Sequence, residues 1–291
     1  MSRNDERLGL PTEERVPSSV GGGTPPSMGG AFEWAVPTYI VPLPTKGKYY
    51  DEDHPCHGIE QVEIRYMTAK EEDMLTSEHL LKEGVAHTRM VQNLIMDPKI
   101  SVRDMLVQDV GALMIAARIT GYGSEYDVSV RCPACLSVVD HSFNVEEALH
   151  KSIEDTRSRL GQLPEPYSAG DNRWLVGVTL PLTKAQVAIR WLSGADEEKF
   201  SKLNYQKSTT ASESLITDLL RSMIVSINGE DNPIAVAHLI KTMPTQDGVF
   251  LRNAYINMIP SFKLQQTYSC QSCGHTADTE VPLNATFFWP N

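Results

Sequence analysis

Long apolar runs, basic residues and familiar catalytic motifs are scarce or missing in this chain, and each lack argues against a class of protein. No apolar run approaches the ~20 residues of a membrane-spanning helix. Lysine and arginine total 26 against 37 acidic residues, and the net charge of -11 disfavours a nucleic-acid partner, because phosphate contact needs a basic face. No GxSxG, Walker or HExxH pattern is present, so the sequence predicts neither an enzyme nor a small-molecule substrate.

Cysteine is also scarce, with 5 residues in a chain of 291. Four of them fall in two CxxC pairs, Cys132–Cys135 and Cys270–Cys273. The polar and charged start of the chain predicts no signal peptide. Thiols in such pairs, without a targeting segment, fit a reducing cytoplasm in which a metal rather than a disulfide holds them.

The two CxxC pairs predict one bound zinc ion. A CxxC turn points both sulfurs into one concavity, and two such turns can supply four thiolates to a tetrahedral Zn²⁺. The expected ligands are Cys132, Cys135, Cys270 and Cys273. Because four thiolates leave no open coordination position, the predicted metal is structural and not catalytic. His141 and His275 lie near the pairs as alternative ligands, but four sulfurs already complete the set.

A thioredoxin-like redox pair and two unrelated thiol pairs are the alternatives to a zinc site. A redox CxxC opens a helix after a buried strand, and the sequence Leu136–Asp140 does not resemble such a helix. Strand-like sequence flanks the pairs instead, at residues 126–130, 138–143 and 262–268. Each pair is therefore predicted to form the tip of a hairpin, with Gly274 free to take a positive φ after the second.

The predicted fold class is α+β, with a four-cysteine zinc ribbon split by a long insertion. Five segments are expected: an arm over 1–30 that is disordered or held by a partner, an α+β domain over 31–123, the first ribbon hairpin over 124–145, a mostly helical inserted domain over 146–260, and the second hairpin with an aromatic C-terminus over 261–291. The arm is rich in proline and glycine and has few apolar anchors, which is typical of a segment that does not fold alone.

Local patterns predict the individual elements. Thr68 and Glu71 form a capping box that starts a helix reaching about residue 82, and Asp109 is a possible cap for an apolar helix. Further helices are expected at 85–96, after Ser101, and at 145–160, 183–191, 213–227, 235–241 and 245–258, with a polar loop over 202–212. Strands are expected within 35–44, at 62–66 and at 174–180.

Two other clusters could carry a function. His54-Pro-Cys56-His57 is interpreted as a polar loop with a lone cysteine and not as a second metal site, because the ligand count falls short. Phe287, Phe288 and Trp289 are three adjacent aromatics that could anchor a partner protein. The same three residues could instead tuck into this chain's own core, which the nearby second CxxC pair favours.

Several blocks of the sequence resemble the baseplate protein family of T4-type contractile-tailed phages. They are residues 62–77, 112–123, 132–135, 243–252, 270–274 and 287–290, in this order. The resemblance spans roughly residues 36–290 and leaves out the N-terminal arm. The four cysteines carry over as metal ligands, and no catalytic residue does.

The resemblance implies a non-enzymatic structural component of the baseplate hub region. Its partners would be other tail proteins, and it would be multimeric only within the assembly. It would reside in the virion tail baseplate, and in the host cytoplasm during assembly. A hub assembly chaperone that is not retained in the virion is the first alternative, and a nucleic-acid-binding zinc ribbon is the second.

Overall fold

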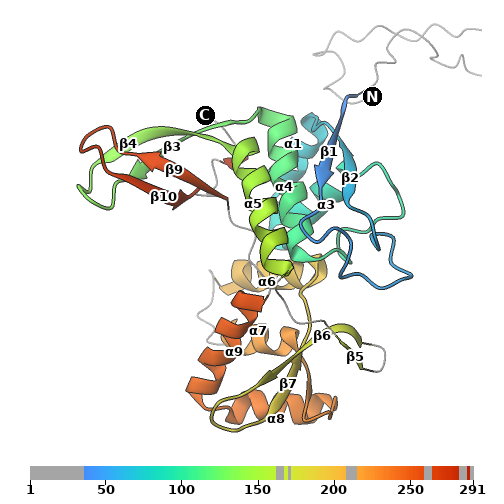
Figure 1. The fold of residues 1–291 in the computed structure, drawn as a ribbon. Coiled ribbons are helices and arrows are strands. Elements are labelled where there is room, and N and C mark those ends of the chain that lie inside the picture. The colour runs from blue at the N-terminus through green and yellow to red at the C-terminus, as the bar shows by residue number, and fades with distance from the viewer. Residues whose placement is uncertain are drawn as a thin grey trace, which may run out of the picture. The chain divides into compact units, whose positions relative to one another are not determined.

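The computed structural model describes residues 36–161, 167–169, 172–207, 215–258, 264–281 and 287–288, and it has a mixed α+β fold (Figure 1). The predicted arm over 1–30 and Trp289 lie outside these residues. Among the described residues, no helix is long and apolar enough to cross a membrane.

The N-terminal unit packs four helices against a two-stranded sheet. Its elements are β1 (Thr38–Pro42), β2 (Gln61–Arg65), α1 (Ala69–Thr76), α2 (Glu78–Lys82), α3 (Ala86–Leu94) and α4 (Val107–Tyr122). The strands pair antiparallel with Tyr39 opposite Ile64. Val62 and Ile64 alternate with exposed residues and point into the main core, as the period of two predicts.

The capping box at Thr68 forms as predicted, but the helix it starts is shorter than expected. The Thr68 amide and hydroxyl donate to the Glu71 carboxylate at 3.0 and 2.7 Å, and Arg65 pairs with the same carboxylate. The predicted helix to residue 82 is interrupted at Ser77 between α1 and α2, and the segment after Ser101 forms turns instead of a helix.

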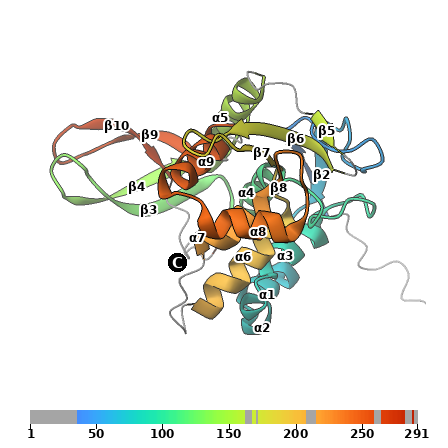
Figure 2. The same cartoon turned by 90° about the horizontal axis from the view of Figure 1, so that it is seen from below.

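Two β-hairpins make up the ribbon, one directly after the N-terminal unit and one near the end of the chain. The first consists of β3 (Glu125–Arg131) and β4 (Val138–Asn144), and the second of β9 (Gln265–Ser269) and β10 (Thr276–Glu280). Helix α5 (Val145–Leu160) continues directly from β4. Both views show the two hairpins side by side (Figures 1 and 2). Both are anchored at their bases, because Tyr126, Phe143, Leu264 and Val281 are buried in the main core.

The insertion contains a four-stranded antiparallel sheet as well as helices. The strands are β5 (Tyr167–Ala169), β6 (Asn172–Thr179), β7 (Gln186–Ile189) and β8 (Ile224–Ile227), in that order across the sheet. The helices are α6 (Gly194–Lys207), α7 (Leu215–Met223), α8 (Pro233–Thr242) and α9 (Thr245–Met258). This sheet and helices α7–α9 surround a second hydrophobic core.

Three predictions inside the insertion were wrong in detail. The helix expected over 183–191 is strand β7, where Val187, Ala188 and Ile189 are all buried because the strand lies inside the sheet. The helix expected over 213–227 ends at Met223, and its β-branched end forms β8. Part of the polar segment expected to be a loop is the end of α6.

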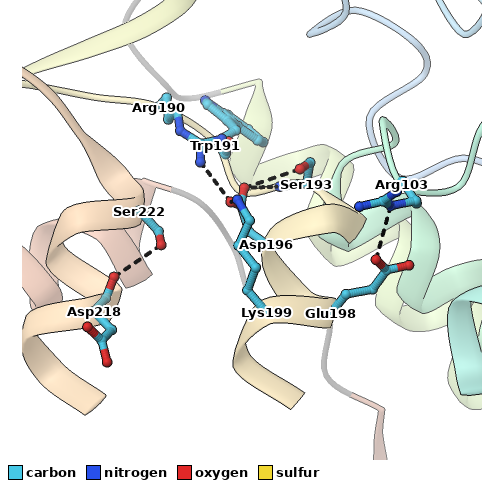
Figure 3. Close-up of polar contacts among 9 residues, drawn as sticks. All are labelled: Arg103, Arg190, Trp191, Ser193, Asp196, Glu198, Lys199, Asp218 and Ser222. Carbon is cyan, nitrogen blue, oxygen red and sulfur yellow. Dashed lines mark hydrogen bonds and ion pairs between the residues drawn. The ribbon is translucent and has the colours of Figure 1, made fainter. Parts of the chain in front are cut away.

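Helix α6 joins the insertion to the N-terminal unit (Figure 3). Asp196 in its first turn accepts from Ser193 and pairs with Arg190 at 2.9 Å, which holds the start of the helix to the end of β7. Two residues further on, Glu198 pairs with Arg103 at 3.0 Å and accepts from Thr88 at 2.7 Å. Both contacts reach residues of the N-terminal unit.

Two glycines permit the close packing at this joint. A side chain at Gly84, whose φ is +71°, would lie 2.6 Å from the backbone nitrogen of Lys202. A side chain at Gly194 would lie 2.3 Å from the carbonyl oxygen of Val102. Backbone therefore meets backbone at two places along α6, and larger residues at these glycines cannot be accommodated without a shift.

Candidate metal centre

The four predicted cysteines meet at the tips of the two hairpins. All four sulfurs lie within 4.8 Å of one another. The Sγ atoms of Cys132 and Cys273 are 3.8 Å apart, and those of Cys135 and Cys270 are 3.7 Å apart. A tetrahedral zinc with Zn–S bonds of about 2.3 Å requires sulfurs about 3.8 Å apart. The cysteines are free and far from disulfide contact, so the arrangement fits a four-thiolate metal site.

The first knuckle is closed by two backbone hydrogen bonds. The Cys132 amide donates to the Ser137 carbonyl at 2.9 Å, and the Leu136 amide donates to the Cys132 carbonyl at 2.9 Å. Leu136 has a φ of 62°, in the left-handed region that favours glycine. Nothing in the sequence signalled this conformation, because leucine seldom adopts it.

The second knuckle repeats the same geometry. The Cys270 amide donates to the His275 carbonyl at 2.8 Å, and the Gly274 amide donates to the Cys270 carbonyl at 2.9 Å. Gly274 has a φ of 70°, as its position after the CxxC pair predicted. Two copies of one turn therefore face each other, and each contributes one buried and one exposed cysteine.

The local electrostatics favour thiolate at two of the four positions. The pKa of Cys270 is lowered to about 5, and the neighbouring Tyr268 side chain is the largest cause. The pKa of Cys135 is lowered, first by its hydrogen bond with the Ser137 hydroxyl, whose oxygen lies 2.9 Å from the sulfur. Because metal binding requires deprotonated sulfur, these contacts prepare the site for a cation.

Histidine is not part of the four-residue cluster. The ring of His141 packs edge-on against Phe143 and Tyr268, at 4.5 and 5.3 Å between centroids. His275 contributes its backbone carbonyl to the second knuckle. Among the described residues, the cysteine set is the one group of three or more possible ligands that could share an ion.

The outward faces of the ribbon are acidic. Exposed side chains on the two hairpins include Glu125, Asp127, Asp140, Asp278 and Glu280, against Arg131 as the exposed basic residue of these strands. Such a surface repels phosphate groups. The charge distribution thus agrees locally with what the net charge indicates for the whole chain.

Cys56 lies in a buried polar cluster and is not one of the four clustered cysteines. Its side chain is fully buried, and burial raises the pKa of its thiol to about 12, so it is neither a ready ligand nor a reactive thiol. The His54 ring stacks on Tyr50 and accepts from the Cys56 amide, and the Tyr50 hydroxyl donates to Asp109 at 2.7 Å. These contacts fold the loop between β1 and β2 onto α4.

Phe287 and Phe288 are buried in this chain's main core, where the self-packing alternative places them. Phe287 packs edge-on against Tyr126 of β3, and Phe288 packs against His87 of α3. Trp289 lies outside the described residues, so its predicted role as a partner anchor stays a prediction. The two described side chains contribute to stability through the core.

Arg118 is a structural residue that sequence reasoning missed. It is 1% exposed, and its guanidinium donates to the carbonyls of Phe287 at 2.8 Å, Glu125 at 2.9 Å and Gly123. The same group lies 5.7 Å from the centroids of the Tyr126 and Phe287 rings. This single side chain joins α4 to the base of the first hairpin and to the C-terminal aromatics. An arginine within an apolar helix was the available signal.

We compared the chain with protein families, curated proteins and solved structures. Neither the curated proteins nor the solved structures gave a match. The family model described as T4 bacteriophage base plate protein matches residues 36–289, which include both knuckles, Arg118 and the buried C-terminal aromatics. With nearly the whole chain matched, and with the four sulfurs gathered as the CxxC pairs predict, this protein belongs to the T4 bacteriophage base plate protein family.

Proposed function

We propose that this protein is a structural, non-enzymatic component of the hub region of a phage tail baseplate. It binds other tail proteins, and one zinc held by Cys132, Cys135, Cys270 and Cys273 stabilises it. The family match over residues 36–289 is the observation that carries the proposal. The clustered cysteines support its metal component. The protein would reside in the virion after assembly in the host cytoplasm.

The zinc would cross-link two hairpins that are far apart in the sequence. The Cys132 and Cys273 sulfurs are separated by 141 residues in sequence and by 3.8 Å in space. Structural zinc contributes on the order of 10 kcal/mol to the folding of small metal domains. Four thiolates satisfy the ion completely, so this metal would hold the two hairpins together and supply no catalysis.

Helix α9 carries a surface suited to binding another protein. Its outward positions are all exposed and uncharged: Thr245, Gln246, Val249, Phe250, Asn253 and Ile256. They fall on one face at helical spacing, opposite the buried Asp247 and Leu251. Three of these exposed positions, Val249, Phe250 and Ile256, are large and apolar, and an uncharged surface of this kind is typical of the centre of a protein–protein interface. We assign it to an uncharged, apolar surface of another tail protein.

The surface is tested by complementation of a phage that lacks this protein. Phe250→Ser and Ile256→Ser shorten two exposed side chains of the α9 face, and Gln246→Ser is the matched control on the same face. We expect all three proteins to be folded, and the two apolar variants to yield fewer complete baseplates. Normal assembly with both apolar variants contradicts the assignment of this face. Self-association of the purified wild type through α9 in sedimentation would assign it to a second copy instead.

Particle composition tests the structural role itself. Quantitative mass spectrometry of purified virions should find this protein at a fixed ratio to other baseplate proteins. Its presence in assembling cells and its absence from finished particles would instead identify an assembly chaperone. Binding of DNA or RNA by the purified protein near physiological salt would support the nucleic-acid alternative, which the acidic ribbon faces argue against.

A further inference from the structure

Tyr268 is buried beside the cysteine cluster with its hydroxyl unpaired. It lies on β9 two residues before Cys270, is 1% exposed, and packs with Cys132, Cys270, Val130 and Val139 between the two hairpins. Within the described part of the chain, its hydroxyl makes no hydrogen bond of conventional geometry. A buried hydroxyl left without an acceptor costs about 1–3 kcal/mol, so this atom needs a partner.

Two buried cysteine side chains pack with Tyr268. They are Cys270, two residues further along the chain, and Cys132 of the other hairpin. A thiolate bound to a metal keeps lone pairs that can accept a hydrogen bond. Metal loading would therefore give the Tyr268 hydroxyl the acceptor that it otherwise lacks.

We infer that Tyr268 is a positioning residue of the zinc site, whose hydroxyl donates a hydrogen bond to the metal-bound Cys270 sulfur. The inference rests on the proposed zinc site and adds the group that orients one of its ligands. Outer groups of this kind typically change metal affinity 10- to 100-fold when they are removed. Val130 occupies the equivalent position two residues before Cys132, so the first knuckle has no such donor. The two buried cysteines therefore differ, because Cys270 has a tyrosine hydroxyl two residues before it and Cys132 has a valine there.

The test replaces Tyr268 by phenylalanine, which keeps the ring between the hairpins and removes the hydroxyl. Tyr126→Phe is the matched control, because Tyr126 is a buried tyrosine of the other hairpin at 2% exposure. Cobalt(II) is loaded in place of zinc, and the sulfur-to-cobalt charge-transfer band is recorded. Zinc affinity is measured by competition with a chromogenic chelator, and alkylation of Cys270 in the loaded protein by iodoacetamide is followed by peptide mass spectrometry.

The expected results separate a hydrogen bond from packing. In Tyr268→Phe the charge-transfer band moves to lower energy, zinc affinity falls about 10-fold or more, and Cys270 reacts faster. In Tyr126→Phe all three stay as in the wild type. A loaded Tyr268→Phe protein with an unchanged band and unchanged affinity overturns the inference while the zinc site stands. A folded wild type that binds neither metal overturns the inference together with the proposed site.

A second measurement covers a Tyr268→Phe protein that does not fold. Wild-type protein produced with 3-fluorotyrosine keeps every ring and strengthens each phenol as a donor. Its charge-transfer band should move to higher energy than in the unlabelled protein. A band at the same energy contradicts a hydrogen bond from Tyr268 to the metal-bound sulfur.

Discussion

The two knuckles make the same turn from different sequences. Each closes with the same pair of backbone hydrogen bonds and places its fifth residue at a positive φ. The second knuckle uses Gly274 there, and the first uses Leu136. The second has Tyr268 behind its buried cysteine, and the first has Val130. One turn geometry is therefore made by two different sequences, and the energetic cost of that geometry differs between them.

The largest expected effect comes from removing one cysteine ligand from each knuckle, which tests whether both knuckles bind the same ion. Cys132→Ser and Cys270→Ser each remove one of four ligands, so both should lose stoichiometric zinc. Each should lose much of the metal's contribution to folding, which is on the order of 10 kcal/mol in small zinc domains. Zinc content and thermal unfolding are the measurements. If one variant keeps its metal and its melting temperature, the knuckles do not share one ion.

The second prediction concerns the base of the first hairpin. Arg118→Met leaves the carbonyls of Gly123, Glu125 and Phe287 without their donor, and it should cost about 3 kcal/mol of unfolding free energy. Hydrogen exchange should rise first near the start of β3. Arg118→Lys is the control, because it keeps the charge but not the planar fork. A urea midpoint equal to the wild type would contradict a structural role for this side chain.

The third prediction compares the exposed cysteines of the metal-free protein. The pKa of Cys135 is lowered below its usual value, and Ser137 is the largest cause, so more of this thiol is ionised at neutral pH than of an ordinary cysteine. A backbone hydrogen bond at His275 lowers the pKa of Cys273, but the neighbouring cysteines and burial outweigh it and raise the value to about 12. Iodoacetamide at pH 7 should therefore modify Cys135 at least about 10-fold faster.

Peptide mapping over time measures this difference. The rate at Cys273 should climb as the pH rises toward 10, while the rate at Cys135 should level off at a lower pH than the rate at Cys273. Equal rates at neutral pH would show that the two exposed thiols are electrostatically equivalent.

The smallest expected effects come from the residues at positive φ. Gly274→Ala should destabilise the protein by about 1 kcal/mol, because alanine is strained there. Leu136→Gly removes backbone strain from the folded state, but glycine also raises the conformational entropy of the unfolded chain. The two effects oppose each other, so the variant should be more stable by at most about 0.5 kcal/mol. Chemical denaturation of zinc-loaded protein measures both. Leu136→Gly costing as much as Gly274→Ala would mean that the Leu136 side chain contributes binding energy of its own.

The sequence predicts the metal centre better than it predicts the insertion. Cysteine spacing and alternating polarity locate both hairpins, because a metal ligand and a strand each leave a local pattern. Val187 to Ile189 leave no such pattern, since a strand covered on both faces reads as a short apolar run that a helix could also contain. Arg118 stands out as an arginine within an apolar helix, but its bond to Phe287 and the packing of Tyr268 with Cys132 join distant parts of the sequence, so the local sequence could not reveal these partners. Leu136 takes a conformation that leucine seldom adopts, so its residue type gave no signal.

The bond between Arg118 and the Phe287 carbonyl spans 169 residues and has a consequence for biosynthesis. Helix α4 emerges from the ribosome long before the aromatic residues that complete its packing. Its buried guanidinium must stay hydrated, or be shielded by a chaperone, until the C-terminal segment has been translated. The native state therefore forms after translation of the segment that contains Phe287, and nascent chains halted earlier are expected to be targets of cellular proteases.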